Sequence, residues 1–174
     1  MSSRANNSSS KHRQLIDGNV VEPQESGALD VVKAIGAMNR SYQPWLRETS
    51  AVRSQYFLRS IESFRLKVQN SADELTTLLA LDIGTAKEVA QAESLPTALA
   101  LLDRLLADQR EYLERPFLPV GHSALFLGWS DPLVQFCRRV PAIMSAGGGL
   151  VVKPSRRASK IVLRMGELWT QALS

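Results

Sequence analysis

Pro119-Val-Gly-His-Ser-Ala-Leu-Phe-Leu-Gly-Trp-Ser-Asp-Pro132 is followed further along the chain by Leu150-Val-Val-Lys-Pro-Ser155. In each stretch a short apolar run, beginning at Ala124 or at Leu150, ends at residues that terminate a strand. The runs lead into predicted helices over Pro132 to Ala146 and over Arg157 to Leu173. The order strand, helix, strand, helix is typical of a parallel βαβ unit. The sequence therefore predicts an α/β fold with an incomplete, doubly wound, Rossmann-like parallel sheet.

A helical region is predicted before this unit, because apolar residues recur there at helical spacing. The predicted helices cover Leu29 to Met38, Ala51 to about Asn70, Ser71 to about Gly84, and Thr85 to Leu106. Glu48-Thr-Ser50 supplies a capping group for the second helix, and Ser71-Ala-Asp-Glu74 is a capping box for the third. Thr85 is expected to cap the fourth helix and Pro96 to bend or split it. The apolar positions identify a core and not an activity.

The first residues of the chain are polar, and we expect residues 1–14 to form a disordered tail. Residues 15–174 are expected to form one domain. At its start, Leu15-Ile-Asp-Gly-Asn-Val-Val21 predicts two short extended segments around an Asp-Gly turn, which is a common hairpin signal.

The composition argues against several classes of protein. Hydrophobic residues make up 44% of the 174 residues, and no apolar window is long enough to span a membrane. The net charge of +4 is modest and the basic residues are interspersed with acidic ones, so we expect no nucleic acid partner. One cysteine and two histidines exclude an intramolecular disulfide and leave too few ligands for a zinc site. A reducing, cytoplasmic location fits best.

Cys137 and His122 could be taken for catalytic groups, but a structural role is favoured for both. Cys137 lies within the predicted helix after Pro132, next to Phe136, as an inert core cysteine would. His122 lies at the start of a predicted strand, and no carboxylate partner is identifiable.

The carboxyl ends of the two predicted strands form the candidate binding site. Ligands bind there in an open α/β sheet, because backbone N–H groups and the helix dipole favour phosphate. Lys153 can reach a ribose or phosphate oxygen from such an end, Pro154 fixes the turn, and Ser155 can cap the next helix. From the residues alone, a solvated turn is an equal alternative.

These motifs resemble the aldehyde dehydrogenase superfamily, whose members show Pro-Trp-Asn-x-Pro after one strand and Val-Val-x-Lys-Pro-Ser-Glu at the next. The chain aligns with this pattern from Pro119 to Arg156, with one extra residue near Met144. Upstream, Leu15-Ile-Asp-Gly18 resembles an opening Ile-Asn-Gly strand, and Leu79-Ala-Leu-Asp-Ile-Gly84 resembles Leu-x-Leu-Glu-Thr-Gly. The resemblance implies the N-terminal part of an NAD(P)-binding domain, in a truncated and divergent member.

The resemblance also implies roles for single residues. Trp129 falls on a cofactor-contacting tryptophan and Lys153 on the lysine that binds the adenosine ribose hydroxyls, while Pro154 and Ser155 shape the same pocket. Arg156 replaces a glutamate that accepts from the 2′-hydroxyl, so we expect NADP to be favoured over NAD. The alternative for Arg156 is an exposed basic start of a helix.

Two departures bear on catalysis. Ser130 takes the place of the asparagine that donates to the oxyanion in the family, and losing such a donor costs about 10²–10³ in kcat. Asp131 replaces an apolar residue beside the active site, where we expect its negative charge to oppose an oxyanion.

The resemblance implies an aldehyde dehydrogenase-like oxidoreductase, in which a cysteine thiolate attacks the aldehyde, hydride passes to the nicotinamide and a glutamate assists hydrolysis. The chain stops before the regions that carry the Gly-rich turn, the glutamate and the cysteine, so we expect no complete catalytic set and no activity alone. The alternative is a non-catalytic, degenerate module that binds a partner chain.

The expected partners are a second copy of the chain or a complementary C-terminal chain, bound through an open sheet edge. The connection from Tyr112 to Pro119 is too short for the arm through which the family oligomerises. We also expect one face of the last helix, with Ile161, Val162, Met165, Leu168 and Trp169, to be partly uncovered.

Overall fold

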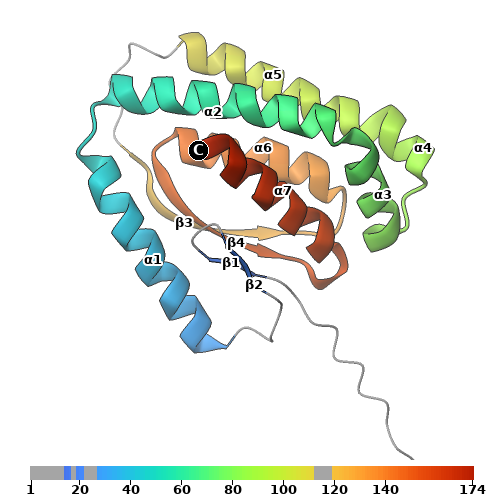
Figure 1. Ribbon diagram of the computed structural model, residues 1–174, viewed down its shortest axis with the longest axis horizontal. Coiled ribbons are helices and arrows are strands. Elements are labelled where there is room, and N and C mark those ends of the chain that lie inside the picture. The colour runs from blue at the N-terminus through green and yellow to red at the C-terminus, as the bar shows by residue number, and fades with distance from the viewer. Residues whose placement is uncertain (1–13, 17–18, 22–26, 112–118) are drawn as a thin grey trace, which may run out of the picture.

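The computed structural model describes residues 14–16, 19–21, 27–111 and 119–174 (Figure 1). In chain order the elements are β1 (Gln14–Ile16), β2 (Asn19–Val21), α1 (Ala28–Leu46), α2 (Ser50–Asn70), α3 (Ala72–Ile83), α4 (Lys87–Val89), the π-helical segment η1 (Ala90–Ser94), α5 (Leu95–Glu111), β3 (Gly121–Leu127), α6 (Pro132–Ser145), β4 (Gly148–Pro154), the 3₁₀ turn η2 (Arg156–Ala158) and α7 (Ser159–Leu173).

The two predicted strand pairs are present. β3 and β4 run parallel, with α6 between them in the chain, which confirms the predicted βαβ unit. Both strands are longer than the apolar runs that predict them. β3 already begins at Gly121, and β4 begins at Gly148 and continues through Lys153 and Pro154. β1 and β2 pair antiparallel, with Gln14 opposite Val21, and their predicted Asp-Gly turn lies outside the described residues.

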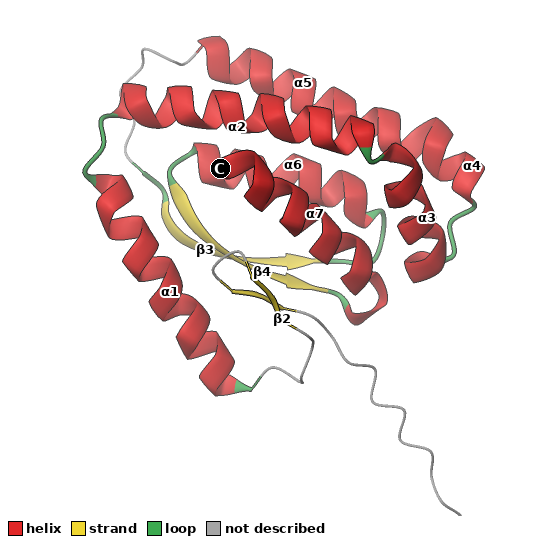
Figure 2. Cartoon of the chain, viewed as in Figure 1, coloured by secondary structure: helices red, strands yellow, loops and turns green. Residues whose placement is uncertain are grey.

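The helices form layers over the β3–β4 sheet. Figure 2 shows α6 and α7 above the two strands, with α2 and α5 in a further layer above them. α1 lies near the N-terminal ends of the two strands, away from the α6 and α7 layer, and contacts β4 (Figure 2). A Cβ atom on Gly149 would come within 3.0 Å of the Met38 side chain, so this helix approaches the strand closely. The architecture is thus a helix-rich α/β fold with a small parallel sheet.

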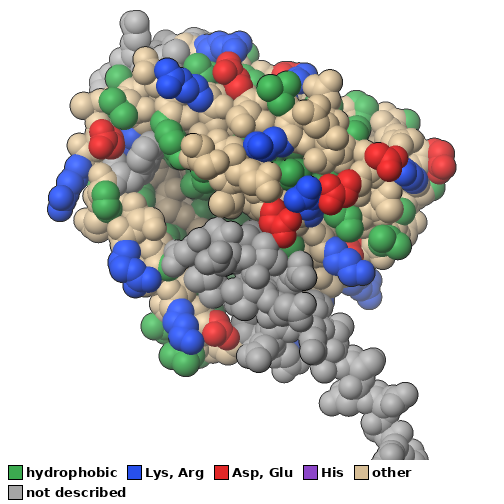
Figure 3. Space-filling view, in the orientation of Figure 1, with side chains coloured by type: hydrophobic (Ala, Val, Ile, Leu, Met, Phe, Trp, Pro, Cys, Tyr) green, Lys and Arg blue, Asp and Glu red, His purple; other side chains and the backbone are tan. Residues whose placement is uncertain are grey.

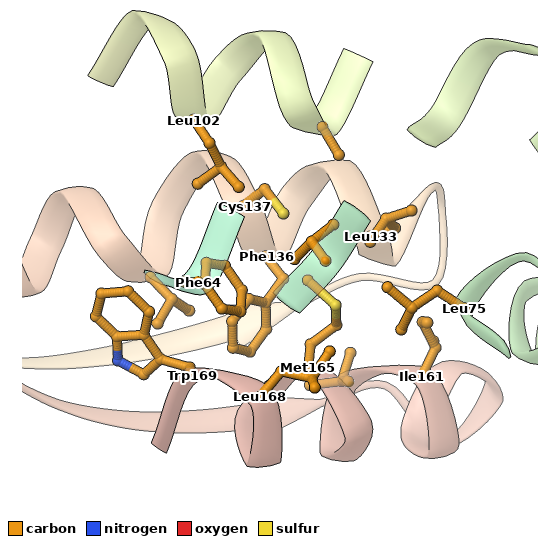
Figure 4. Packing of buried hydrophobic residues seen from close by; sticks show 14 of the residues in the cluster. Phe64, Leu75, Leu102, Leu133, Phe136, Cys137, Ile161, Met165, Leu168 and Trp169 are labelled. Carbon is orange, nitrogen blue, oxygen red and sulfur yellow. The ribbon is translucent and has the colours of Figure 1, made fainter. Parts of the chain in front are cut away.

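The core lies between α7, α6, α2 and α5. The Trp169 ring meets the Phe64 ring edge-on at a centroid distance of 5.1 Å, and the Phe136 ring lies 6.0 Å from that of Phe64 (Figure 4). The expectation of a partly uncovered last helix is wrong: Ile161, Val162, Met165, Leu168 and Trp169 are at most 4% exposed. The helices α2, α3 and α6 of the same chain cover this face of α7.

Some predicted helix boundaries hold and others fail for identifiable reasons. Thr49 caps α2, because its hydroxyl accepts from the Val52 N–H at 3.3 Å. The Ser71 side chain makes no cap bond, since Ser71 also ends α2 and its backbone (φ −98°, ψ 17°) is not extended as a helix cap requires. Thr85 is not the cap expected, because the next helix begins two residues later, at Lys87.

Pro96 is expected to bend or split the fourth predicted helix, but α4, η1 and α5 follow one another without a gap, so the helix is not split and only the type of turn changes before the proline. The π-helical segment η1 ends at Ser94, immediately before α5 begins. Proline has no N–H to donate to the preceding turn, and a wider turn accommodates the lost hydrogen bond. Among the described helices, none combines the length and apolar character needed to cross a membrane.

Candidate cofactor-binding site

The carboxyl ends of β3 and β4 lie side by side and define the candidate site. The strand register pairs Phe126 with Lys153 and Leu127 with Pro154. The N–H of Ser155 donates to the carbonyl of Leu127 at 2.8 Å. The loop after β3 and the turn after β4 are therefore joined by a main-chain hydrogen bond.

A contact between Trp129 and Arg157 joins the same two segments. The guanidinium carbon of Arg157 lies 5.7 Å from the centroid of the Trp129 ring, which is within cation–π range. Trp129 is 53% exposed, so much of its ring remains open to a ligand. The sequence marks Arg157 only as a basic residue at a helix start, because this contact depends on how two distant loops pack.

Lys153 is exposed at the end of β4 beside Phe126, which is 69% exposed. Since register partners in a sheet project to the same face, both side chains emerge on the face opposite α6. At the start of that face, the Tyr42 ring of α1 lies 4.6 Å from the His122 ring. α1 therefore covers the beginning of the face and leaves its carboxyl end open.

Pro154, Ser155 and Arg156 form the turn after β4. The Ser155 hydroxyl accepts from the Arg157 N–H at 3.3 Å, so Ser155 caps the helical region as predicted, although the capped residues form the 3₁₀ turn η2. Arg156 is exposed as the first residue of η2. The sequence-predicted cofactor residues are thus brought to one end of the sheet.

Ser130 and Asp131 complete the loop after β3. Ser130 is exposed, and its carbonyl accepts from the Gln135 side chain. Asp131 caps α6: one carboxylate oxygen accepts from the Val134 N–H at 3.3 Å and the other from the Ser94 hydroxyl at 2.9 Å. The charge of Asp131 is therefore engaged by a helix terminus and a neighbouring helix. A sequence signal for this role exists, because Asp before Pro is typical of a helix start.

Asp131 also has a left-handed backbone, with φ 41° and ψ 65°. Among the described residues other than glycine, it is the one with a positive φ. Aspartate tolerates this conformation better than most residues, since its short side chain bonds locally.

Cys137 is buried in α6 and is 1% exposed. Burial, together with the nearby charge of Asp131, raises the pKa of its thiol. Figure 4 shows its side chain among the apolar residues of the core. The geometry supports the interpretation of an inert core cysteine. In the part of the chain that the structure describes, no group of three or more His, Cys, Asp or Glu could hold a metal ion.

A second feature lies beside β4, which pairs with β3 on one edge in the described sheet. A cavity of about 480 Å³ runs along residues 148–152 and is bounded by α1, α6 and α7. Its lining includes Ala34, Met38, Phe136, Val140, Val162 and Leu173. Figure 3 shows a hollow between α1, on the left, and the helices above it. The surface beside the β4 edge is therefore concave and largely apolar.

Comparison with known proteins identifies relatives of this fold. Residues 12–173 match the model of the aldehyde dehydrogenase family. An aldehyde dehydrogenase from Bartonella henselae superposes with a TM-score of 0.80 at 17% sequence identity, over 94% of this chain and 40% of that one. A mutant aldehyde dehydrogenase C from Pseudomonas syringae, solved with NAD⁺ and octanal, superposes with a TM-score of 0.78 at 23% identity, over 97% of this chain and 36% of that one.

An NAD-dependent aldehyde dehydrogenase from Sinorhizobium meliloti is also similar, with a TM-score of 0.73 at 23% identity. The chain spans between 35% and 40% of the length of these three structures. The family match covers nearly all of the chain, and the βαβ unit with its Trp129 and Lys153 loops lies within it. The chain belongs to the aldehyde dehydrogenase family.

Proposed function

We propose that the chain forms the adenosine-binding part of the NAD(P) site of an aldehyde dehydrogenase-like oxidoreductase. One observation carries this proposal: the loop after β3, with Trp129, and the turn after β4, next to Lys153, contact each other at the carboxyl end of the sheet. This is the place where open α/β sheets bind nucleotides. The family match over residues 12–173 supports the proposal.

In this proposal Lys153 donates to the ribose hydroxyls of the cofactor. Its exposure at a strand end and the cap at Ser155 suit that role, since the cap fixes the turn without using the ammonium group. Trp129 offers an apolar ring, held by Arg157, against which the cofactor packs. When bound, the nicotinamide part would accept the hydride in aldehyde oxidation.

We further propose that Arg156 favours NADP over NAD. A guanidinium group pairs with a phosphate through charge-assisted hydrogen bonds, which a 2′-hydroxyl cannot match. Arg156 is exposed and directly follows the Lys153-Pro-Ser turn, so its position suits contact with the 2′ substituent.

Calorimetric titration of the chain with NADP⁺ and with NAD⁺ tests this preference. We expect NADP⁺ to bind more tightly, and Arg156→Glu to weaken NADP⁺ binding about tenfold. The same change should strengthen NAD⁺ binding, because a glutamate there can accept from the 2′-hydroxyl. Arg139→Glu is the matched control, because it reverses the charge of another exposed arginine, on α6. Equal affinities for the two dinucleotides in the unmodified chain would rule out the role of Arg156.

We propose that the chain alone does not oxidise aldehydes. The thiol of Cys137, the one cysteine of the chain, is buried and protonated, so it cannot serve as the nucleophile. The Ser130 hydroxyl is shorter than the asparagine amide of the family, which weakens oxyanion stabilisation. NADP⁺-dependent oxidation of an aldehyde by the purified 174-residue chain would refute this proposal. We also propose a cytoplasmic location, because a single cysteine can form no intramolecular disulfide and a reducing compartment suits such a chain.

A second candidate function is association with another chain, either a second copy or a complementary C-terminal part. The apolar cavity beside the outer edge of β4 favours it, since unpaired strand edges and apolar hollows attract partners. We expect sedimentation velocity to show association that grows with concentration.

The variant Ala34→Glu separates this association from non-specific aggregation. It places a charge in the cavity lining and should reduce association, whereas Ala51→Glu on the exposed side of α2 should not. A monodisperse monomer at high concentration would count against this candidate.

A further inference from the structure

The N-terminus of α7 is capped by a carboxylate from a distant part of the chain. Asp82, in the last turn of α3, accepts a hydrogen bond from the N–H of Ile161 at 3.0 Å, across 79 residues of sequence. Ile161 is the third residue of α7, so its N–H has no partner within the helix. At the other end of α3, Glu74 pairs with Arg164 at 2.9 Å. α3 is thereby fastened to α7 at two points.

The negative charge of Asp82 at the N-terminus of α7 should weaken the attraction of this helix end for anions. The first turn of a helix carries free N–H groups and a partial positive charge, so it attracts anions such as phosphate. In this chain the half-buried carboxylate of Asp82 already takes that place. The N-terminus of α7 therefore offers less positive potential to a ligand than the helix alone would.

Asp82 also lies close in the fold to the proposed cofactor site, because α3 packs against η2, the turn that carries Arg156 and Arg157, and η2 leads directly into α7. Contacting elements lie within about one Debye length, roughly 8 Å at physiological ionic strength, so screening between them is incomplete. Around this turn Lys153, Arg156, Arg157 and Lys160 are all exposed. Asp82 places a carboxylate at the terminus of the helix that follows these basic residues.

We propose that Asp82 is a specificity-determining residue, whose charge at the α7 terminus limits the preference of the proposed cofactor site for a 2′-phosphate over a 2′-hydroxyl. The inference rests on the proposed function, because it concerns the same site. Arg156 and Asp82 then act in opposite directions on one ligand group, and the balance between them sets the ratio of the two affinities.

Titration of the ¹⁵N-labelled chain, followed by NMR, tests the inference with adenosine 2′,5′-bisphosphate and adenosine 5′-monophosphate as probes. Asp82→Asn removes the charge but keeps an oxygen that can accept from Ile161. We expect this variant to bind the bisphosphate two- to fivefold more tightly, relative to the monophosphate, at about 20 mM salt. The gain should shrink below about 1.5-fold at 0.5 M salt, because screening removes a purely electrostatic effect.

Asp73→Asn is the matched control, since Asp73 lies in the first turn of the same helix, where it pairs with Lys87. Its affinity ratio should equal that of the unmodified chain. Asp82→Ala, which also removes the acceptor, should in addition lower the Tm by about 2–4 °C. The NMR spectra show directly whether each variant is folded.

An affinity ratio that is unchanged in Asp82→Asn, while both probes still bind, would overturn the inference and leave the proposed function standing. A gain that persists in high salt, or that Asp73→Asn reproduces, would also overturn it. Failure of the unmodified chain to bind either probe would overturn the proposed function together with the inference.

Discussion

The state of the Cys137 thiol makes the stability of the chain depend on pH. Burial raises the pKa of this thiol, and Asp131 adds to the effect, so the folded chain keeps its proton at alkaline pH. The unfolded chain loses that proton above an ordinary thiol pKa of about 8.5. The unfolded state therefore binds fewer protons there, and the stability of the fold must fall as the pH rises.

We expect the free energy of unfolding to fall by about 2 kcal/mol more in the unmodified chain than in Cys137→Ala between pH 8 and pH 10. Urea titrations at pH 8, 9 and 10 measure this difference, in which the other titrating groups cancel. Parallel pH profiles for the two proteins would mean that the thiol is not protected.

Gly147 is a position that only glycine fits well. Its φ is +77°, and a Cβ atom there would lie 2.9 Å from the Cβ atom of Pro119. A left-handed conformation costs other residues about 1–2 kcal/mol, and the overlap adds to that cost. We expect Gly147→Ala to destabilise the fold by about 2 kcal/mol or more in urea unfolding.

Gly36→Ala is the control for this change and should act in the opposite direction. A Cβ atom there would meet only the Arg40 side chain, at an ordinary 3.6 Å, within α1. Alanine is the better helix former by about 0.8–1 kcal/mol, so we expect a gain in stability. Equal losses for both variants would contradict the backbone argument.

The candidate site could be predicted from the sequence only in part. The rule that ligands bind at strand ends predicts Lys153, Pro154 and Ser155 as site residues, with a solvated turn as the equal alternative, and their role stays a prediction. Arg157 and Asp82 could not be found in this way, because their contacts depend on how segments far apart in the chain pack. The sequence predictions for Asp131 concern its charge and do not include its role as the cap of α6, although its place before Pro132 favours that role.

Most of the large apolar side chains of α7 are buried in the core. Trp169 is 4% exposed and meets Phe64 of α2 edge-on, while Trp129 in the loop after β3 is 53% exposed. The two tryptophans allow the same substitution to be compared in the core and at the site.

We expect Trp169→Ala to lower the free energy of unfolding by about 3–5 kcal/mol, since it empties a large buried volume. Trp129→Ala should cost at most about 1 kcal/mol, the value of an exposed cation–π contact. Urea unfolding followed by circular dichroism measures both. A small loss for Trp169→Ala would show that α7 is not docked as described.

Hydrophobic spacing predicted the existence and type of most elements, and their ends less well. α1 continues to Leu46, well beyond the predicted Met38, because the residues after Met38 also fit a helix, in which the Tyr42 ring packs against the His122 ring of β3. Ser71 and Thr85 match capping patterns, but the backbone they would cap starts in another conformation or at another residue. Local patterns cannot reveal such competition between adjacent helices.

In the described part of the molecule, the β3–β4 sheet has two strands, and the candidate site lies at the carboxyl end of both. Several helices cover one face of the β3–β4 pair, so the carboxyl ends of both strands are held in place by a core within this chain. The described part of the chain therefore has a core of its own, and we propose that the carboxyl end of its sheet binds a nucleotide. Resemblance of sequence suggested the fold, and packing of α7 against α2 explains why the chain can adopt it.

Thermal unfolding of the purified chain, followed by circular dichroism with and without millimolar NADP⁺, tests this claim most directly. Because a ligand that binds only the native state stabilises it, we predict a cooperative transition that moves up by about 3–5 °C at ten times the Kd. The shift should disappear in Lys153→Ala and persist in Lys33→Ala, which removes an exposed lysine on α1. A transition that NADP⁺ does not move, or that moves equally in Lys153→Ala, would mean that the carboxyl end of the sheet does not bind the dinucleotide through Lys153.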